Sequence, residues 1–509
     1  MVVAFLGILV SLGFLIFMAY RGHSVIVIAP IAALIAVVFS GAPLLASYTQ
    51  IFMPALGGFI VNFFPLFLVG AIFGRLMSVS GFADDIARFV PRIFGQKQAI
   101  VVTIVITALL AYGGINAWVI AFTVMPIAKP LFKHANVSLK LMPAAIAAGM
   151  FTFATAALPG TPQIHNAIPT RFFGTTTWAA PWIGVLGSIL MFILSVVWLR
   201  MRESSLRAAG HGYDEKILIG GAVQTGKTVS TNSDSPDTSQ ENAAGKPAVK
   251  KEHAGKQALQ EAYGEVSLDG PSGDIIRRGL IGLVPVLAVV LLNAVFVYII
   301  SPQMDTGYLA QKLYGETNVS AVLGVWSVLF GLIVGILLIF LIRPRSAATF
   351  LAGLSEGARN AVVPALTTAS EVGYGAVIAA LSVFALITNA LFGIGDNPLV
   401  IGVVATAVIA AITGSSSGGL SITLQTFGEQ LQSLALEQGV SVEVLHRIIA
   451  MASVSFDSLP HNGAIVTLLV VCGLSHRQSY KDVFVVTVLV PFLGVLFTMG
   501  MYALVPGLV

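Results

Sequence analysis

Long apolar segments recur along most of the chain, and they constrain the fold more than any other feature. In the first 200 residues they cover roughly residues 2–20, 25–46, 55–79, 98–112, 115–132, 141–158 and 178–199. After a polar stretch they resume at roughly 279–300, 318–342, 352–394, 398–412, 441–456, 464–474 and 482–508. Only 10% of the residues are charged and 56% are hydrophobic, whereas a soluble domain is about a quarter charged. Such a chain cannot cover itself with polar surface, so we expect an all-α polytopic membrane protein.

Several of these segments are too short for a simple helix across the bilayer, which needs about 20 residues. Short apolar pieces interrupted by Gly and Pro are typical of re-entrant hairpins and discontinuous helices. The first segment lacks a basic start and a small-residue cleavage site, and Arg21 follows it. We therefore expect a retained transmembrane helix, not a cleaved signal peptide, with the Arg21 end in the cytoplasm.

The polar stretch at residues 203–275 contains a literal match to the phosphate-binding pattern G-x-x-x-x-G-K-[ST], at Gly221–Thr228. A working phosphate loop lies between a strand and a helix of an α/β domain, but here VSTNSDSPDT follows the motif, and its composition favours disorder. We therefore expect no nucleotide at this match. The sequence predicts three parts: an N-terminal transmembrane repeat at 1–202, a cytoplasmic, largely disordered linker at 203–275, and a C-terminal transmembrane repeat at 276–509.

The two halves contain similar Gly-rich segments and similar breaks. AYGGINAWVIAF at 111–122 precedes a Leu158-Pro159 break followed by GTPQIHNAIPT, and ITGSSSGGLSIT at 412–423 precedes a Leu459-Pro460 break followed by HNGAIVT. Leu158 lies 45 residues after Gly113, and Leu459 lies 45 residues after Gly414. This spacing indicates an internal repeat.

Charge placement predicts that the two repeats are inverted. Three lysines (Lys129, Lys133 and Lys140) follow the first Gly-rich segment, whereas three glutamates (Glu429, Glu437 and Glu443) follow the second. If basic ends face the cytoplasm, equivalent elements point in opposite directions. Many secondary transporters have this architecture and bind their substrate near the midplane, between broken helices.

At these segments the chain resembles the GntP family of bacterial carboxylate permeases, within the wider ion transporter superfamily. The likeness covers most of both halves and is carried by YGGINAWVIAFTVMPIA, AALPGTPQIHNAIPT, ASEVGYG at 369–375, TGSSSGGLSI and SFDSLPHNGAIVTLL. The LPGTPQ form is similar to the hydroxybutyrate permease branch more than to the gluconate branch. The resemblance implies a multi-pass protein of the bacterial cytoplasmic membrane that carries small organic acids with protons. It also implies a scaffold domain, a mobile transport domain, an elevator-type movement and a homodimer.

Four polar or Gly-rich clusters could bind a carboxylate at the midplane, because helix N-termini there offer free N–H groups and a positive dipole end. The residues that we expect to contact substrate are Gly113, Gly114, Asn116, Thr161, Gln163, His165, Asn166, Ser415, Ser416, Ser417, Gly418, Gly419, Ser458, His461 and Asn462. The alternative is that the small residues only allow close helix packing. Either histidine could instead be a structural helix cap.

Two carboxyl groups in apolar surroundings are candidates for proton coupling: Glu371 in TTASEVGYG and Asp457 directly before the second break. Burial favours the protonated form of a carboxyl group, as a proton carrier requires. A structural ion pair or a helix cap is the alternative for each.

The leading hypothesis is a proton-coupled symporter of a short hydroxy- or ketoacid, with 3-hydroxybutyrate first and gluconate second. A sodium-coupled symporter and an anion channel remain open. An intramembrane enzyme is disfavoured, because the chain has no H-E-x-x-H pattern and no nucleophile elbow. The single cysteine, Cys472, excludes an internal disulfide and a multi-cysteine metal site. We expect no cofactor, no metal and no nucleic-acid partner.

Overall fold

The computed structural model describes residues 2–21, 23–115, 117–218, 272–344, 347–460 and 462–508. The helices of the first half are α1 (Val2–Tyr20), α2 (Val25–Ser40), α3 (Leu44–Ala46), α4 (Met53–Val79), α5 (Phe82–Phe94), α6 (Ala99–Tyr112), α7 (Ala117–His134), α8 (Met142–Met150), α9 (Phe153–Ala156), α10 (Ile164–Phe173) and α11 (Pro181–Ala208). Those of the second half are α13 (Ser272–Val295), α14 (Val319–Ile342), α15 (Ala347–Ala380), α16 (Phe384–Phe392), α17 (Pro398–Thr413), α18 (Ser416–Glu437), α19 (Val442–Ser453), α20 (Gly463–Val471), α21 (His476–Phe484) and α22 (Val490–Leu504). The described residues contain no strand.

Seven helical segments among the described residues are long and apolar enough to cross a membrane. They confirm the prediction of a polytopic all-α protein. Helix α11 continues to Ala208 and α13 begins at Ser272, so both helices extend into the predicted linker at 203–275. The phosphate-loop match at 221–228 and the rest of the predicted linker, residues 219–271, lie outside the described residues.

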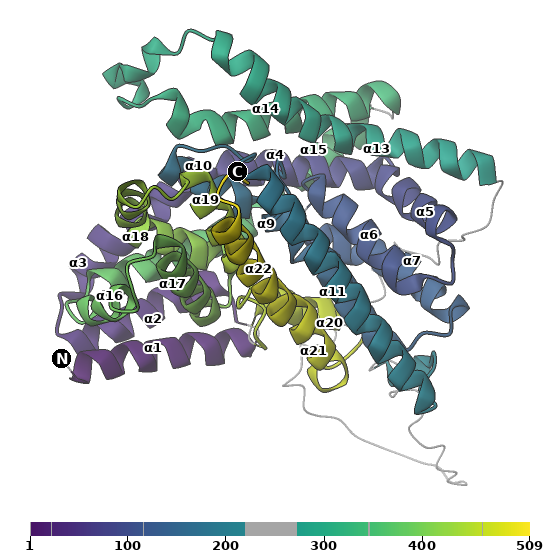
Figure 1. Cartoon of the computed structure of the whole chain (residues 1–509), viewed down its shortest axis with the longest axis horizontal. Coiled ribbons are helices and arrows are strands. Elements are labelled where there is room, and N and C mark those ends of the chain that lie inside the picture. Colours follow the sequence, from purple (N-terminus) through teal and green to yellow (C-terminus); the bar gives the residue numbers. More distant parts are fainter. Residues whose placement is uncertain are drawn as a thin grey trace, which may run out of the picture.

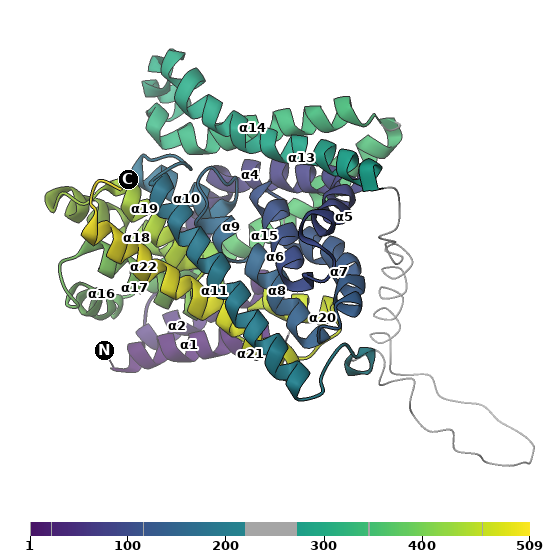
Figure 2. The same ribbon diagram turned by 45° about the vertical axis from the view of Figure 1, so that its right-hand side comes forward.

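Helices at equivalent positions in the two halves make equivalent contacts. The α1–α2 pair corresponds to α13–α14, the α6–α8 contact to α17–α19, and the α2–α15 contact to α14–α4. Helices α4 and α15 contact each other, as do α11 and α22, which lie side by side in Figures 1 and 2. These contacts have the pattern of a two-fold internal repeat, in which equivalent helices pair across the axis.

Helices α6 and α7 form a re-entrant hairpin, hereafter hairpin 1. The guanidinium group of Arg200 donates a hydrogen bond to the side chain of Gln98, just before α6. The guanidinium group of Arg207 donates to the carbonyl oxygen of Ala135, just after α7, at 3.4 Å. Both arginines lie near the C-terminal end of α11, so the two ends of hairpin 1 lie on the same side of the molecule.

Helices α17 and α18 form the second re-entrant hairpin, hairpin 2, which enters from the opposite side. Gln438, just after α18, donates a hydrogen bond to the carbonyl oxygen of Asp396, just before α17, at 2.6 Å. The N–H group of Ala180, just before α11, donates to Glu443 at the start of α19, at 3.4 Å. The loops that follow the two hairpins therefore lie at opposite ends of α11, which spans about 42 Å at 1.5 Å per residue. This arrangement confirms the predicted inverted topology.

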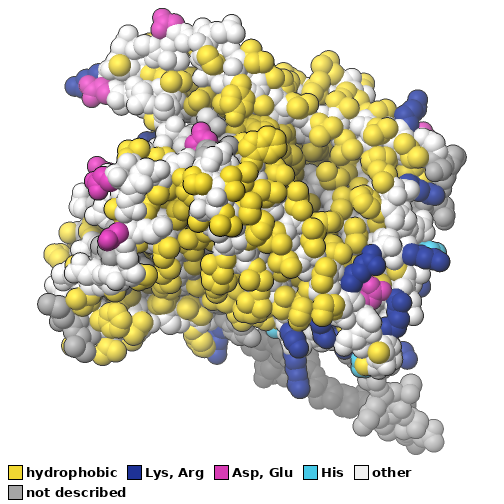
Figure 3. Space-filling model, in the orientation of Figure 1, with side chains coloured by type: hydrophobic (Ala, Val, Ile, Leu, Met, Phe, Trp, Pro, Cys, Tyr) yellow, Lys and Arg dark blue, Asp and Glu magenta, His cyan; other side chains and the backbone are white. Residues whose placement is uncertain are grey.

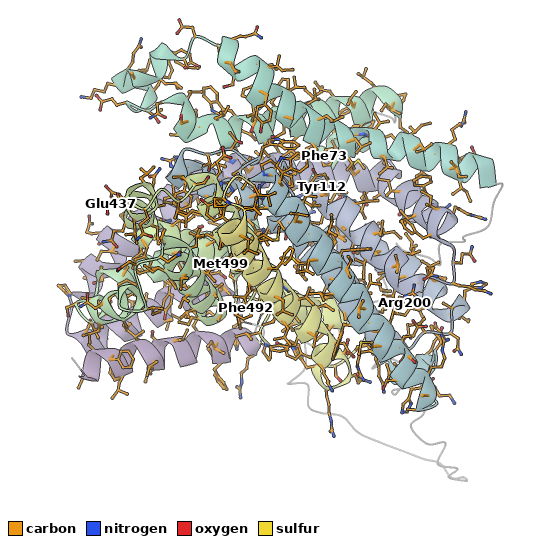
Figure 4. All side chains as sticks on the ribbon, viewed as in Figure 1. Phe73, Tyr112, Arg200, Glu437, Phe492 and Met499 are labelled. Carbon is orange, nitrogen blue, oxygen red and sulfur yellow. The ribbon has the colours of Figure 1, made fainter. Side chains whose placement is uncertain are left out.

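The surface charges separate along the same direction. Figure 3 shows an apolar band with most Lys and Arg side chains on the side where hairpin 1 opens. Figure 4 places Arg200 and Glu437 on opposite sides of the molecule. By the positive-inside rule, the Arg200 side is the one expected to face the cytoplasm.

Two further helices are interrupted in the middle. Residues 151–163 separate α8 from α10 and include only the single turn α9, and we call them break 1. Residues 454–462 separate α19 from α20, and we call them break 2. Each hairpin tip lies against one break, where irregular backbone is covered by protein, as the bilayer requires.

Candidate functional site

The tip of hairpin 1 is fastened to break 1 by side-chain hydrogen bonds. The chain turns at Gly114 with a φ of +86°, which favours glycine. Gln163 Nε2 donates to the carbonyl oxygen of Ala111 at 2.7 Å, and the Tyr112 hydroxyl donates to that of Pro159 at 2.8 Å. A Cβ atom on Gly114 would lie 2.9 Å from Pro162 Cγ. Tip and break therefore form one tightly packed unit.

The tip of hairpin 2 is fastened to break 2 in an equivalent way. Asn462 Nδ2 donates to the carbonyl oxygens of Gly414 and Asp457, each at 3.0 Å. Asn462 Oδ1 accepts from the N–H groups of Ala464 at 2.7 Å and Ile465 at 2.9 Å, so the side chain also caps α20. Asn462 and Gln163 each directly precede the helix that follows a break. Asn462 therefore corresponds in the structure to Gln163 and not to Asn166.

One polar cluster joins the two halves of the chain at hairpin 2. Nε2 of His165, in the first turn of α10, lies 2.6 Å from the hydroxyl oxygen of Ser416, the first residue of α18. The Ser416 side chain also interacts with the Asp457 carboxyl of break 2. The Ser458 hydroxyl donates to Asp457 Oδ1 at 3.0 Å. Ser416 therefore connects a histidine of the first repeat to a carboxyl group of the second.

A second buried carboxyl group lies on the other side of the hairpin 2 tip. Glu371 of α15 is only 5% exposed, and its carboxyl group interacts with the Ser415 side chain. A Cβ atom on Gly418 would lie 2.4 Å from Glu371 Oε2, so a larger residue at this position would displace the carboxyl group. One turn earlier on α15, the Thr368 hydroxyl lies 3.4 Å from that of Ser417. The start of α18 thus lies between Asp457 and Glu371.

Several buried polar atoms at the centre have no hydrogen-bond partner among the described residues. They include Nδ1 of His165, the hydroxyl of Thr161 and Oε2 of Glu371. Four helices (α7, α10, α18 and α20) also begin at the hairpin tips and breaks. Their N-termini carry partial positive charge, which favours an anion, although Asn462 and Ser415 already accept from N–H groups at the starts of α20 and α18. The arrangement combines donors for an anionic group with carboxyl groups that could carry protons.

Two comparisons with known proteins give a match, and the scan of protein-family models gives none. "Uncharacterized transporter YxjC" of Bacillus subtilis (strain 168) is 37% identical over 488 residues, which cover 95% of each chain. The chain belongs to the family of YxjC. It is a membrane transporter. The crystal structure of the Alcanivorax borkumensis YdaH transporter matches 88% of this chain and 87% of its own, at 14% identity and with a TM-score of 0.44.

In this YxjC-family transporter, some of the predicted substrate ligands already have all their hydrogen bonds within the protein. Asn166 is fully buried and donates to the carbonyl oxygens of Thr161 and Thr177. Its Oδ1 accepts from Arg447 at 2.7 Å and lies 3.3 Å from His446 Nε2. Asn166, like Asn462, therefore holds the architecture in this conformation.

Two of the predicted site glycines have a packing role. A Cβ atom on Gly113 would lie 2.8 Å from Val286, and one on Gly419 would lie 2.5 Å from the Ala410 Cα atom. At these two positions the structure favours the alternative that small residues allow close helix contact. The predicted ligands Asn116 and His461 lie outside the described residues.

Sequence reasoning missed Arg447, the largest fully buried side chain among the described residues. Its guanidinium group donates to the carbonyl oxygens of Ala156, Thr177 and Ala179 and to Asn166, at 2.7 to 3.0 Å. All five N–H donors are thus used, and they fasten break 1 and the start of α11 to α19. The sequence did point to this residue, because Arg447 lies within the apolar stretch VEVLHRIIAMAS. A charged side chain there is as costly in a membrane as Glu371 or Asp457.

Within the described ranges, no group of three or more His, Cys, Asp or Glu side chains is arranged to hold a metal ion. The polar cluster at the hairpin 2 tip contains one histidine, Ser415 to Ser417 and two separate carboxyl groups. These groups suit hydrogen bonding to a small polar substrate.

Proposed function

We propose that this transporter carries a short hydroxy- or ketoacid together with protons, and that 3-hydroxybutyrate is the first substrate to test. The observation that carries the proposal is the position of Ser416 between His165 and Asp457, at the start of α18 and close to Glu371. The resemblance of the hairpin and break sequences to the GntP permeases, hydroxybutyrate branch, supports the same substrate class.

The substrate would bind between the two hairpin tips and the two breaks. Its carboxylate would be stabilised by the helix N-termini and by the hydroxyl groups of Ser415 to Ser417. The buried Thr161 hydroxyl and His165 Nδ1 have no partner within the described ranges and are available to a substrate hydroxyl or keto oxygen. A short acid offers both a carboxylate and a hydroxyl or keto oxygen to such donors.

The carboxyl groups of Glu371 and Asp457 would carry the coupled protons. None of the ion pairs found among the described residues involves either of them, although Glu371 is 5% exposed and Asp457 is 4% exposed. A buried carboxylate without a cationic partner is costly, so taking up a proton would accompany closure of the site. Because both carboxyl groups flank α18, substrate and proton would be bound by the same element.

We further propose an elevator-type movement within a homodimer. Hairpins 1 and 2, the two broken helices and the α11–α22 pair would form the transport domain. Helices α1, α2, α4 and α13 to α15 would form the scaffold. Glu371 would then lie on the scaffold and Asp457 on the transport domain, so their shared contact with α18 would change during each cycle.

The test is uptake of labelled 3-hydroxybutyrate into proteoliposomes of the full-length protein, with an imposed inward proton gradient and no sodium. Gluconate is measured in parallel, and a third set receives a sodium gradient without a proton gradient. The proposal predicts accumulation of 3-hydroxybutyrate that a protonophore abolishes. Accumulation of gluconate alone would change the substrate, and accumulation under sodium alone would change the coupling ion. Downhill flux of the acid without accumulation under either gradient would favour a channel.

A further inference from the structure

A cavity of about 300 Å³ opens at the basic side of the molecule, away from the hairpin tips. It lies between the two ends of hairpin 1 and the C-terminal part of α11. Its lining residues are Lys97, Gln98, Ala99, Ile100, His134, Ala135, Arg200, Glu203 and Arg207. None of these residues contributes to the site described above.

The charges around this cavity favour an anion. Lys97, Arg200 and Arg207 contribute three positive charges, and Glu203 contributes one negative charge. Glu203 accepts from Arg207 at 2.7 Å, while Arg200, within the described part of the chain, has the neutral side chain of Gln98 as its hydrogen-bond partner. The cavity lining therefore has a net positive charge. The cationic side chains line one cavity and are not scattered over an exposed surface.

An apolar stripe leads from the cavity along the membrane-facing surface of α11. Ile189, Ile193 and Val197 are about half exposed (50%, 49% and 48%), and they lie on the same face of the helix as Arg200. On the other side of the cavity, Ile93 and Phe94 at the end of α5 are 59% and 45% exposed. A ligand in the cavity would thus have cationic groups at one end and exposed aliphatic side chains next to them.

We propose that this cavity binds the head group of an anionic phospholipid, with its acyl chains along the Ile189–Val197 stripe. Basic pockets between membrane helices on the cytoplasmic side are suited to such head groups. A soluble phosphate would use the cationic groups but would leave the apolar stripe without a role. Because the cavity includes both ends of hairpin 1, the bound lipid would hold the hairpin against α11.

The test uses the purified full-length protein in a neutral detergent. Native mass spectrometry counts bound phosphatidylglycerol, and thermal unfolding is followed while phosphatidylglycerol or phosphatidylcholine is added. We expect phosphatidylglycerol to bind and to raise the unfolding temperature, and phosphatidylcholine to have little effect. Inorganic phosphate and glycerol 1-phosphate are added separately as soluble probes. Equal protection by either soluble probe would overturn the assignment to a lipid.

Charge-removing variants locate the site. Lys97→Gln and Arg200→Gln should each weaken phosphatidylglycerol binding about fivefold, and the double variant should weaken it further. Lys312→Gln removes an exposed lysine from the loop between α13 and α14 and should leave binding unchanged. Lys97 is itself exposed, so its substitution should not disturb folding. Unchanged binding in both Lys97→Gln and Arg200→Gln would overturn the proposal.

Discussion

His165 Nε2 and the hydroxyl oxygen of Ser416 lie 2.6 Å apart, although 251 residues separate them in the chain. The contact joins the helix after break 1 to the tip of hairpin 2, so it connects the two repeats at the centre of the molecule. Since the Ser416 side chain also interacts with Asp457, the contact links the substrate region to a candidate proton carrier.

A double-mutant cycle tests this contact. Ser416→Ala and His165→Ala should each lower transport at least tenfold and destabilise the protein by about 1 kcal/mol, the usual contribution of a hydrogen bond. If the two side chains act together, the double variant should lose much less transport activity and stability than the sum of the losses in the two single variants. The measurements are initial uptake rates and thermal unfolding in detergent.

Ser204→Ala, at an exposed position of α11, is the matched control and should behave as the unmodified protein. Fully additive losses in the double variant would show that His165 and Ser416 act separately.

Arg447→Met should be among the most damaging substitutions to stability. It removes all five donors from a buried network and takes the arginine's donors away from the carbonyl oxygens of Ala156 and Ala179, while the carbonyl oxygen of Thr177 keeps the donors of Asn166 and Gly160. Each buried acceptor left unsatisfied costs about 1–3 kcal/mol, so we expect a loss above roughly 3 kcal/mol, measured as the shift in thermal unfolding. Arg277→Met, whose side chain is 77% exposed, is the control and should have little effect. A shift of similar size in both variants would contradict the role assigned to Arg447.

The close contact between α6 and α8 depends on Gly149. A Cβ atom there would lie 2.0 Å from Thr107 Oγ1 and 2.3 Å from the carbonyl oxygen of Ile104. Gly149→Ala should therefore destabilise the protein by roughly 1–3 kcal/mol and reduce uptake, because hairpin 1 must move away from α8.

Gly57→Ala in α4 provides the opposite case. Apart from its own helix backbone and chain neighbours, no atom lies within 4 Å of the added Cβ, and alanine is the better helix former by up to about 1 kcal/mol. Thermal unfolding of the two variants should shift in opposite directions. A neutral Gly149→Ala would contradict the packing described for hairpin 1.

The elevator proposal can be tested by a cross-link between α15 and α18. The Thr368 and Ser417 hydroxyl oxygens lie 3.4 Å apart, one on the proposed scaffold and one on the proposed transport domain. Cysteines at both positions, in a Cys472→Ala background, should form a disulfide under mild oxidation. Oxidation should then stop uptake, reduction should restore it, and each single-cysteine variant should be insensitive. Full uptake by the cross-linked protein would show that α15 and α18 do not separate during transport.

The sequence predicted much of the architecture but little of the contact network. The apolar segments, the Gly-rich segments at 111–122 and 412–423 with their breaks, and the opposite charges that follow were sufficient to predict inverted broken repeats, because each depends on local backbone or membrane chemistry. The partnership of His165 with Ser416 could not be predicted, because it depends on how two distant segments pack. Asn166 was predicted to bind substrate because nothing near it in the sequence indicates that its side-chain oxygen accepts a hydrogen bond from the distant Arg447.

The central claim is that the acid and protons cross the membrane together, and the most direct measurement follows internal pH in proteoliposomes. A pH-sensitive dye is trapped inside, and 3-hydroxybutyrate is added outside without an imposed ion gradient. The account predicts acidification that depends on the acid and is much reduced in Glu371→Gln or Asp457→Asn, while either variant still exchanges labelled for unlabelled acid. Uptake of the acid at unchanged internal pH, with protein-free liposomes as the baseline, would contradict it.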